Sequence, residues 1–302
     1  MKKNMSTIIL VFIFLMGLSV VLYPTISNYI TVRKQTKTIG EYKEAVAVMD
    51  EIDKEALYNE AVEYNKELAQ LGTTNFKNPI NSDKYNELLN IGGSGVMGYV
   101  TIPRINVELP IYHGTSEGVL QVAVGHLEGS SLPVGGESTH CIISGHRGLP
   151  SSKLFTNLDE LEVHDVFTIT VLGKVLTYEI DQIKTVVPGD TEYLRIEEGK
   201  DYCTLLTCTP YGINTHRLLV RGKRVATLED GGQIYVTADA YKMDTKTVAV
   251  IMAIPLTILI LVGLFINTRH NKKKIAGEAQ AVVLKDDEII FINNDDEDDM
   301  NT

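Results

Sequence analysis

Apolar residues are concentrated in two runs near the ends of the chain. Residues 8–21 are almost all Ile, Leu, Val, Phe and Met, and residues 248–266 form a second run without a charge. A helix needs about 20 apolar residues to cross a bilayer, which the second run provides. The first run is shorter, and it fits either a signal peptide or an uncleaved signal anchor. We favour the anchor because Tyr23-Pro24 follows in place of small residues; a buried core helix is the alternative for either run.

Basic residues flank both runs on their outer sides. Lys2 and Lys3 precede the first run, and Arg269 and three lysines at 272–274 follow the second. The positive-inside rule therefore predicts a two-helix protein of the cell membrane with both termini in the cytoplasm and residues 27–246 outside.

Between the two runs, a helical pattern gives way to a strand pattern. Apolar residues at three-to-four spacing predict a helix over 37–71 that ends at Gly72, then a polar loop over 72–84 and a short helix over 85–89. After Gly95, short β-branched or alternating runs predict seven or eight strands, which favours a sandwich or a closed barrel. These runs are 97–102, 107–111, 141–144, 166–171, 175–187, 203–208 and 218–225, with a hairpin at Gly173-Lys174.

The charge and the cysteine content argue against several classes of protein. The 302 residues carry a net charge of −11, which argues against a nucleic-acid binder. Three cysteines cannot form a disulfide framework, and they show no zinc-binding spacing. A free thiol outside the cell is exposed to oxidation, so an unpaired cysteine there favours a nucleophile.

Three short motifs place reactive side chains at the ends of predicted strands. They are Ser-Gly-His-Arg-Gly at 144–148, Thr-Leu-Leu-Thr-Cys-Thr-Pro at 204–210 and Thr-His-Arg-Leu at 215–218. A cysteine thiolate attacks a carbonyl, a histidine activates it and protonates the leaving amine, and an arginine stabilises the oxyanion. Cys208, His146 and Arg217 are therefore sufficient for thioester chemistry on a peptide bond.

Strand alternation separates the three cysteines. Cys203 lies five residues before Cys208, and Cys141 five before His146, so each pair points to opposite sides of a strand. If Cys208 and His146 face a groove, Cys141 and Cys203 face the core as small buried side chains. A disulfide between these two remains an alternative.

The motif Thr-Leu-x-Thr-Cys, with Arg217 nine residues later and the Gly-His-Arg-Gly segment upstream, closely resembles the sortase family of Gram-positive bacteria. The resemblance runs from about residue 97 to 225. The stretches 125–133 and 154–158, the helical N-terminal extension and the second membrane run resemble the pilus-building class C.

The resemblance implies an eight-stranded β-barrel cysteine transpeptidase that needs no cofactor or metal. It implies cleavage of an LPXTG-like sorting signal between Thr and Gly, with Cys208 as nucleophile, His146 as general acid/base and Arg217 as the oxyanion and substrate stabiliser. The acceptor amine in class C is a pilin lysine. The class C lid carries an Asp-Pro-aromatic motif, whereas this chain has Asn78, Pro79 and Ile80 at that position, so we expect a lid that holds the groove less tightly.

We therefore predict six segments in the chain. They are 1–26 cytoplasmic start and anchor, 27–95 helical extension and lid, 96–228 barrel, 229–246 linker, 247–267 second membrane helix and 268–302 acidic cytoplasmic tail. The other functions considered are a sortase that anchors single proteins to a peptidoglycan precursor, a peptidase that releases its product to water, and a noncatalytic membrane-bound β-domain.

Overall fold

The computed structural model describes residues 2–71, 76, 82–227, 257 and 263. Three helices precede the barrel: α1 (Lys2–Ala47), α2 (Glu51–Gln70) and α3 (Ser82–Glu87). The lid residues Asn78, Pro79 and Ile80, the linker 229–246 and the tail 268–302 lie outside the described residues, as does the second membrane run except Thr257 and Gly263.

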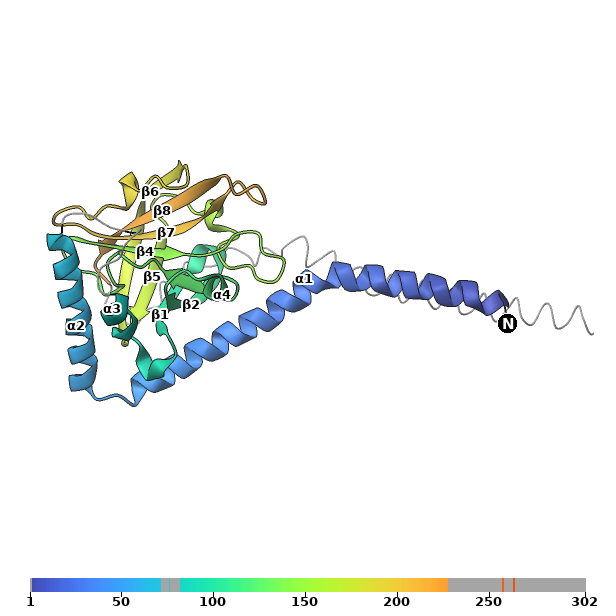
Figure 1. Cartoon of the computed structure of the whole chain (residues 1–302), viewed down its shortest axis with the longest axis horizontal. Helices are drawn as coiled ribbons and strands as arrows, with labels where there is room; N and C mark the ends of the chain where they lie inside the picture. Colours follow the sequence, from blue (N-terminus) through green and yellow to red (C-terminus); the bar gives the residue numbers. More distant parts are fainter. Residues whose placement is uncertain (1, 72–75, 77–81, 228–256, 258–262, 264–302) are drawn as a thin grey trace, which may run out of the picture. The chain divides into compact units, whose positions relative to one another are not determined.

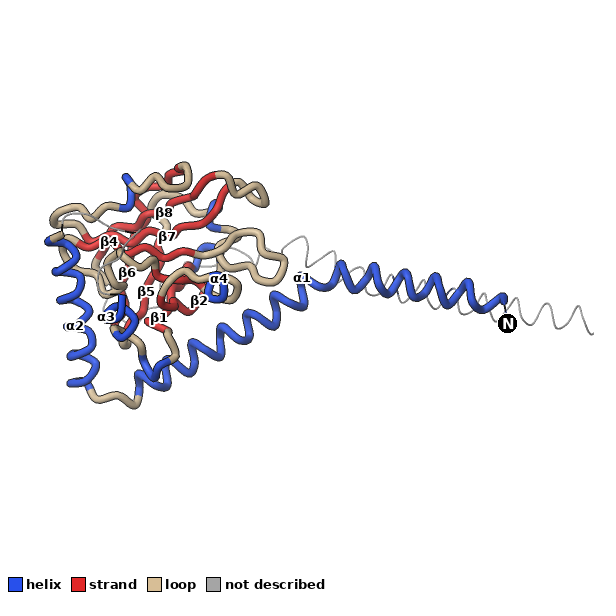
Figure 2. The backbone as a smooth tube through the Cα atoms, viewed as in Figure 1, coloured by secondary structure: helices blue, strands red, loops and turns tan. Residues whose placement is uncertain are grey.

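The strand-rich part is a closed barrel of eight strands in the order β1-β2-β3-β4-β7-β8-β6-β5, which confirms the expected mainly-β fold (Figures 1 and 2). The strands are β1 (Val96–Ile102), β2 (Val107–His113), β3 (Val124–His126), β4 (Thr139–Ser144), β5 (Val166–Val171), β6 (Lys174–Val186), β7 (Asp201–Thr209) and β8 (His216–Val225). The short helical turn η1 (Ile91–Gly93) precedes β1, and further turns lie between the strands: η2 (Pro103–Ile105), α4 (Glu117–Leu120), η3 (Leu158–Glu160) and η4 (Glu192–Leu194).

Alternating apolar residues of the strands fill the barrel. The rings of Phe167 and Tyr178 stack with centroids 5.5 Å apart, and Gly222 lies against them. A Cβ at Gly222 would stand 2.7 Å from the Phe167 ring, so only glycine fits there. The expected hairpin is present: Val171 pairs with Lys174 across Leu172 and Gly173, both with positive φ.

Strand β3 is the one strand that the hydrophobic pattern missed. It has only three residues, in a stretch rich in Gly and Ser that is typical of a loop. Its neighbours define it, since Ile111 of β2 pairs with Val124 and Ser144 of β4 pairs with Gly125.

The single helix predicted over 37–71 is wrong, because the chain turns between α1 and α2. Asp50 has extended backbone angles and precedes α2, whose first turn carries Glu51 and Asp53, both favourable at a helix N-terminus. The two halves bury different apolar faces: the Tyr42 hydroxyl donates to Met97 O (3.0 Å), whereas the Tyr58 hydroxyl donates to Val134 O (2.6 Å). The 3.6-residue period continues through the turn, so it did not reveal the break.

Helix α1 continues without a break through Pro24 and past residue 26, where we expected the anchor segment to end. The part Val11–Ala47 is long and apolar enough to cross a membrane, and it is the one such helix among the described residues. The segment expected to be the anchor and the first part of the extension therefore form one continuous helix, which bends midway along its length (Figure 1).

One buried histidine couples the stability of the barrel to pH. The His140 side chain is 1% exposed; its Nδ1 lies 2.7 Å from Arg195 O and its Nε2 2.8 Å from the Thr204 hydroxyl. Nδ1–H donates to the carbonyl, and Nε2 accepts from the hydroxyl, so the fold holds a neutral ring. Burial lowers the pKa of His140 to about 4.

We expect the free energy of unfolding to fall as the pH drops from about 6.5, the pKa of an unfolded histidine, towards 4. The neutral ring is favoured in the folded state only, so this contribution is complete above pH 6.5 and its loss amounts to about 3 kcal/mol at acid pH. Thermal unfolding of the full chain in detergent measures it. His140→Gln should be less stable at neutral pH but show a flatter pH dependence, whereas His216→Gln, on a surface histidine, should keep the original slope. If the free energy of unfolding depends on pH in the same way in all three proteins, the prediction is contradicted.

Candidate active site

Strands β7 and β8 place Cys208 and Arg217 side by side. The two residues are directly paired in the antiparallel ladder. Paired residues of antiparallel strands project to the same face with Cβ atoms about 5 Å apart, so the two side chains share one face of the sheet. Cys208 is half-buried, whereas Cys203, on the opposite face of β7, is fully buried.

His146 lies on the other side of β7. Strand β4 runs parallel to β7 with Ser144 opposite Leu206, and Gly145 N extends this ladder by donating to Leu206 O (3.0 Å). The Thr207 hydroxyl donates to Gly145 O (2.7 Å), so the next residue, His146, emerges beside Cys208. The structure thus brings together the three residues that the motifs singled out.

Gly145 allows the close approach that positions His146. A Cβ at this residue would stand 2.7 Å from the Phe155 ring and 2.9 Å from Val124 Cγ1. Phe155 also donates its backbone N–H to His146 O (3.2 Å). The Ser-Gly-His motif is therefore a packing requirement as well as a carrier of the imidazole.

Sequence reasoning missed Glu117, which lies on α4 with its Oε2 3.6 Å from His146 Nε2. Gln121 donates to Glu117 Oε1 (2.5 Å), and this hydrogen bond, together with the charge of His146, lowers the pKa of Glu117. His146 Nε2 is buried and has no hydrogen-bond partner among the described residues. No signal in the sequence identified Glu117, because 29 residues separate it from His146 and no motif contains it.

The buried side chain of Arg147, next to His146, connects two other segments of the barrel. Its side chain is 8% exposed, and it pairs with Asp159 of η3 at 2.5 Å and donates to the Thr209 hydroxyl at 3.2 Å. The salt bridge ties the His146 loop to η3, and the hydrogen bond ties it to the end of β7.

Arg217 keeps its charge available. Its Nη1 donates to the carbonyls of Asn214 (3.2 Å) and His216 (3.1 Å). Within the part of the chain that the structure describes, it pairs with no carboxylate. The guanidinium can therefore bind a further carbonyl oxygen or oxyanion.

An outer apolar cluster borders the three residues. We use this name for Ile142, Val186, Leu194 and Leu219 together with the partly buried Phe76, Leu127, Tyr193 and Leu206. Leu206 precedes Cys208 by two residues on β7, and Val186 is the β6 partner of Arg217. Apolar side chains, four of them buried and the others partly buried, thus adjoin the reactive residues along the strands.

Cys141 and Cys203 are opposite each other on β4 and β7, buried and free, as expected for small core side chains. Burial and the neighbouring Cys141 thiol raise the pKa of Cys203. His126 is also fully buried and binds the Tyr85 hydroxyl at 3.0 Å, which fits a structural role.

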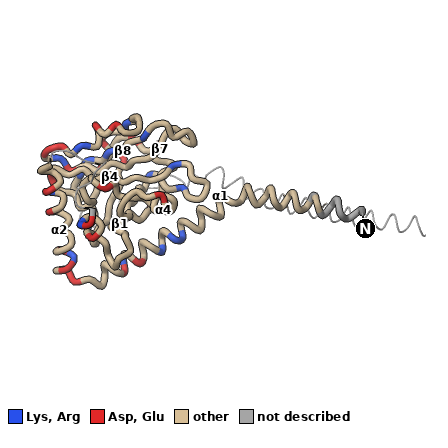
Figure 3. The backbone as a smooth tube through the Cα atoms, viewed as in Figure 1, with Lys and Arg blue, Asp and Glu red and all other residues tan. Residues whose placement is uncertain are grey.

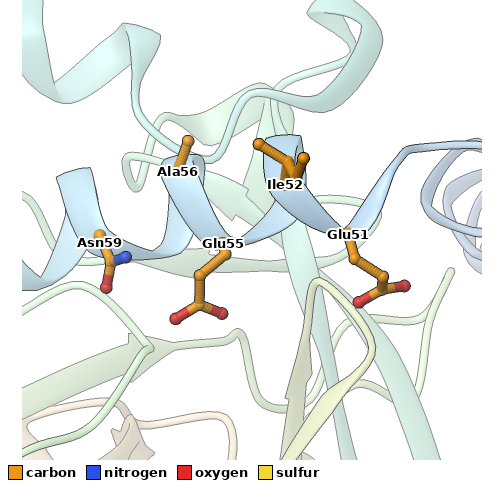
Figure 4. Close-up of a pocket in the computed structure, with 5 residues that line it drawn as sticks. All are labelled: Glu51, Ile52, Glu55, Ala56 and Asn59. Atoms are coloured by element: carbon orange, nitrogen blue, oxygen red, sulfur yellow. The ribbon is translucent and has the colours of Figure 1, made fainter.

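A shallow hollow lies away from these residues, on one face of α2 (Figure 4). It is lined by Glu51, Ile52, Glu55, Ala56 and Asn59. None of the reactive residues lines it, and among the described residues no group of three His, Cys, Asp or Glu side chains could hold a metal ion.

Comparison with known proteins agrees with this geometry. The family model of the sortase domain matches residues 100–225. The crystal structure of sortase C1 from Streptococcus agalactiae is 54% identical, with a TM-score of 0.61, and the match covers 64% of this chain and 100% of that one. Sortase C of Streptococcus pneumoniae, whose structure is described as informative on catalysis and pilin substrate specificity, is 48% identical, with a TM-score of 0.58 and coverage of 63% and 97%. Sortase D of Bacillus subtilis is 35% identical over 131 residues, which are 42% of this chain and 63% of that protein, so the chain spans less than two thirds of this curated relative.

The Glu117–His146 contact predicts how Cys208 reacts. Attack by Cys208 depends on a positioned imidazole, and the Glu117 carboxylate lies beside the His146 ring. Glu117→Gln should therefore slow alkylation of Cys208 at neutral pH by about threefold, the size expected for an exposed pair. Labelling reports Cys208 alone because the other two cysteines are buried.

A matched control is available on the far side of the barrel. Glu179 also pairs with a histidine, His164, at 3.2 Å. Glu179→Gln should leave the rate of Cys208 alkylation unchanged. If Glu117→Gln reacts at the same rate as the unmodified protein, the Glu117–His146 contact does not affect the reactivity of Cys208.

Proposed function

This chain belongs to the sortase family, and we propose that it is a membrane-anchored class C transpeptidase that cleaves an LPXTG-like sorting signal between Thr and Gly and transfers the product to a pilin lysine. The observation that carries the proposal is the row of three side chains across neighbouring strands: His146 after β4, Cys208 on β7 and Arg217 on β8.

In the first step, the Cys208 thiolate attacks the threonine carbonyl carbon. Arg217 stabilises the oxyanion, and the protonated His146 gives its proton to the departing glycine amine. The C–N bond breaks, and a thioester on Cys208 remains. In the second step, His146 takes a proton from the incoming lysine amine, which attacks the thioester and releases the thiolate. The chain's own residues complete both steps without a cofactor.

The outer apolar cluster provides a binding surface for the sorting signal. Its position between Cys208 and the end of β6 suits an extended peptide whose apolar residues precede the scissile bond. Leu206, which is only partly buried, flanks Cys208 on β7, so it would contact the signal residues next to the cut.

Pilin polymerisation is favoured over single-protein anchoring by the class C resemblance. The described helical extension, α2 and α3, precedes the barrel, and the similar solved structures are sortases C. We retain two membrane helices with both termini cytoplasmic as part of the proposal; α1 supplies the first.

Replacing the nucleophile tests the function in the host. Cys208→Ala should abolish the ladder of high-mass, boiling-resistant pilin species in the released wall, because no thioester can form. Cys203→Ala, which removes a buried thiol, is the matched control and should keep the ladder. If Cys208→Ala instead moves one sorting-signal protein from the wall to the membrane fraction, the enzyme anchors single proteins. Normal wall proteins in a strain without other sortases would contradict both.

The lid is proposed to act through Phe76. This residue packs on the outer apolar cluster beside Leu206, which supports a segment that covers the approach to Cys208. Asn78, Pro79 and Ile80 follow it and replace the Asp-Pro-aromatic motif, so Phe76 takes over the aromatic contact.

Removing that contact should expose the thiol. We expect Phe76→Ala to raise the rate of Cys208 alkylation severalfold, since the ring no longer shields the cluster, whereas Ile80→Ala should change it little. Faster labelling in Ile80→Ala alone would make Ile80 the cap, and unchanged rates in both variants would mean that the segment is no functional lid.

A further inference from the structure

We propose that two loops beside the active site, residues 148–153 and 210–215, rest against the outer leaflet of the bilayer that α1 crosses. We call them the membrane-facing loops. The inference rests on the membrane anchoring contained in the proposed function, and it adds a lipid-binding surface on the catalytic barrel itself.

The sequence of helix α1 indicates where its membrane-spanning part ends. No charged residue lies between Lys3 and Arg33, and Figure 3 shows the charged positions of α1 where it runs beside the barrel. A hydrocarbon core about 30 Å thick takes roughly 20 residues, so a span that begins at Ile8 ends near Ser27. The exposed Tyr23 and Tyr29 bracket that point, as tyrosines do at membrane interfaces.

Two side chains of α1 just beyond this point hold the active-site end of the barrel. Asn28 Oδ1 accepts a hydrogen bond from Lys153 N (2.8 Å), and the Thr31 hydroxyl donates to Ser151 O (3.3 Å). At a rise of about 1.5 Å per residue, Thr31 lies about 6 Å past Ser27, which is within the headgroup layer. The loop that follows His146 is therefore fixed at headgroup height.

The opposite end of the barrel is held further along the same helix. The Tyr42 hydroxyl accepts a hydrogen bond from Leu172 N (2.9 Å), in the β5–β6 hairpin. Tyr42 is eleven residues after Thr31, or about 17 Å further along the helix axis. The barrel thus directs the active-site loops towards the bilayer and the hairpin away from it.

The second membrane-facing loop presents large apolar side chains next to the first. Tyr211 is 52% exposed and Ile213 is 68% exposed. The Tyr211 ring lies against Gly148, at 3.2 Å from the position of a Cβ there, and 5.9 Å from the Arg147 guanidinium carbon. The two loops therefore form one continuous surface.

The chemistry of this surface suits a lipid interface. An exposed tyrosine and isoleucine partition into the headgroup boundary, and nearby basic residues favour anionic headgroups. Arg33, Lys34 and Lys37 follow on α1, and Lys153 lies in the first loop. The occupant is thus a phospholipid surface, because the patch continues the contact that α1 itself makes.

Because the chain contains no tryptophan, a single introduced tryptophan reports how deeply its position lies in the bilayer. Three single-tryptophan variants of the full chain are compared in bilayers of phosphatidylcholine and phosphatidylglycerol, with or without bromine near the top of the acyl chains. Phe12→Trp lies within the proposed span, Ile213→Trp lies in a membrane-facing loop, and Val175→Trp lies in the β5–β6 hairpin as a matched exposed control. We expect strong quenching for Phe12→Trp, about twofold quenching for Ile213→Trp and none for Val175→Trp.

The outcomes separate the two proposals. An unquenched Phe12→Trp would overturn the membrane anchoring, and with it this inference. A quenched Phe12→Trp with Ile213→Trp as bright as Val175→Trp would overturn the lipid contact alone and leave the loop as a surface for a protein substrate.

Discussion

The position of strand β7 between β4 and β8 is the constraint on which the site depends. Parallel pairing on one side brings His146 alongside, and antiparallel pairing on the other places Arg217 opposite Cys208. A slip of one residue in either ladder would turn the reactive side chain to the other face of the sheet. Core contacts prevent this slip, because Cys203 and Leu205 of β7 are fully buried and would be replaced by the polar Thr204.

The same constraint explains the glycines and hydroxyl groups of the motifs. Gly145 lets the end of β4 approach Phe155 and Val124, and Thr207 fixes that end through its bond to Gly145 O. Arg147 then locks the loop to Thr209 and Asp159. Much of what resembles a catalytic signature is therefore a set of packing and hydrogen-bonding requirements around one imidazole.

Local patterns were sufficient to predict seven of the strands and the hairpin and to single out Cys208, His146 and Arg217 as candidates, because alternation and motif spacing are properties of short segments. The barrel order, with β4 beside β7, depends on pairings about 60 residues apart, and only the family resemblance supplied the eight-stranded barrel. Strand β3 was missed because partners, not composition, define it. Glu117 was missed because its contact with His146 exists only after β2, α4 and β4 meet.

Side chains of helix α1 hold the loops around His146 in place, which matters for the proposed transfer reaction. An acyl-enzyme is useful for transfer only if its loops stay positioned until the amine arrives. Gln35 of α1 is 6% exposed and donates to Val122 O (2.6 Å), directly after α4, which carries Glu117. Thr31 binds the loop that follows His146. Helix α1, which is long and apolar enough to cross a membrane, thus also supports both segments that surround the imidazole.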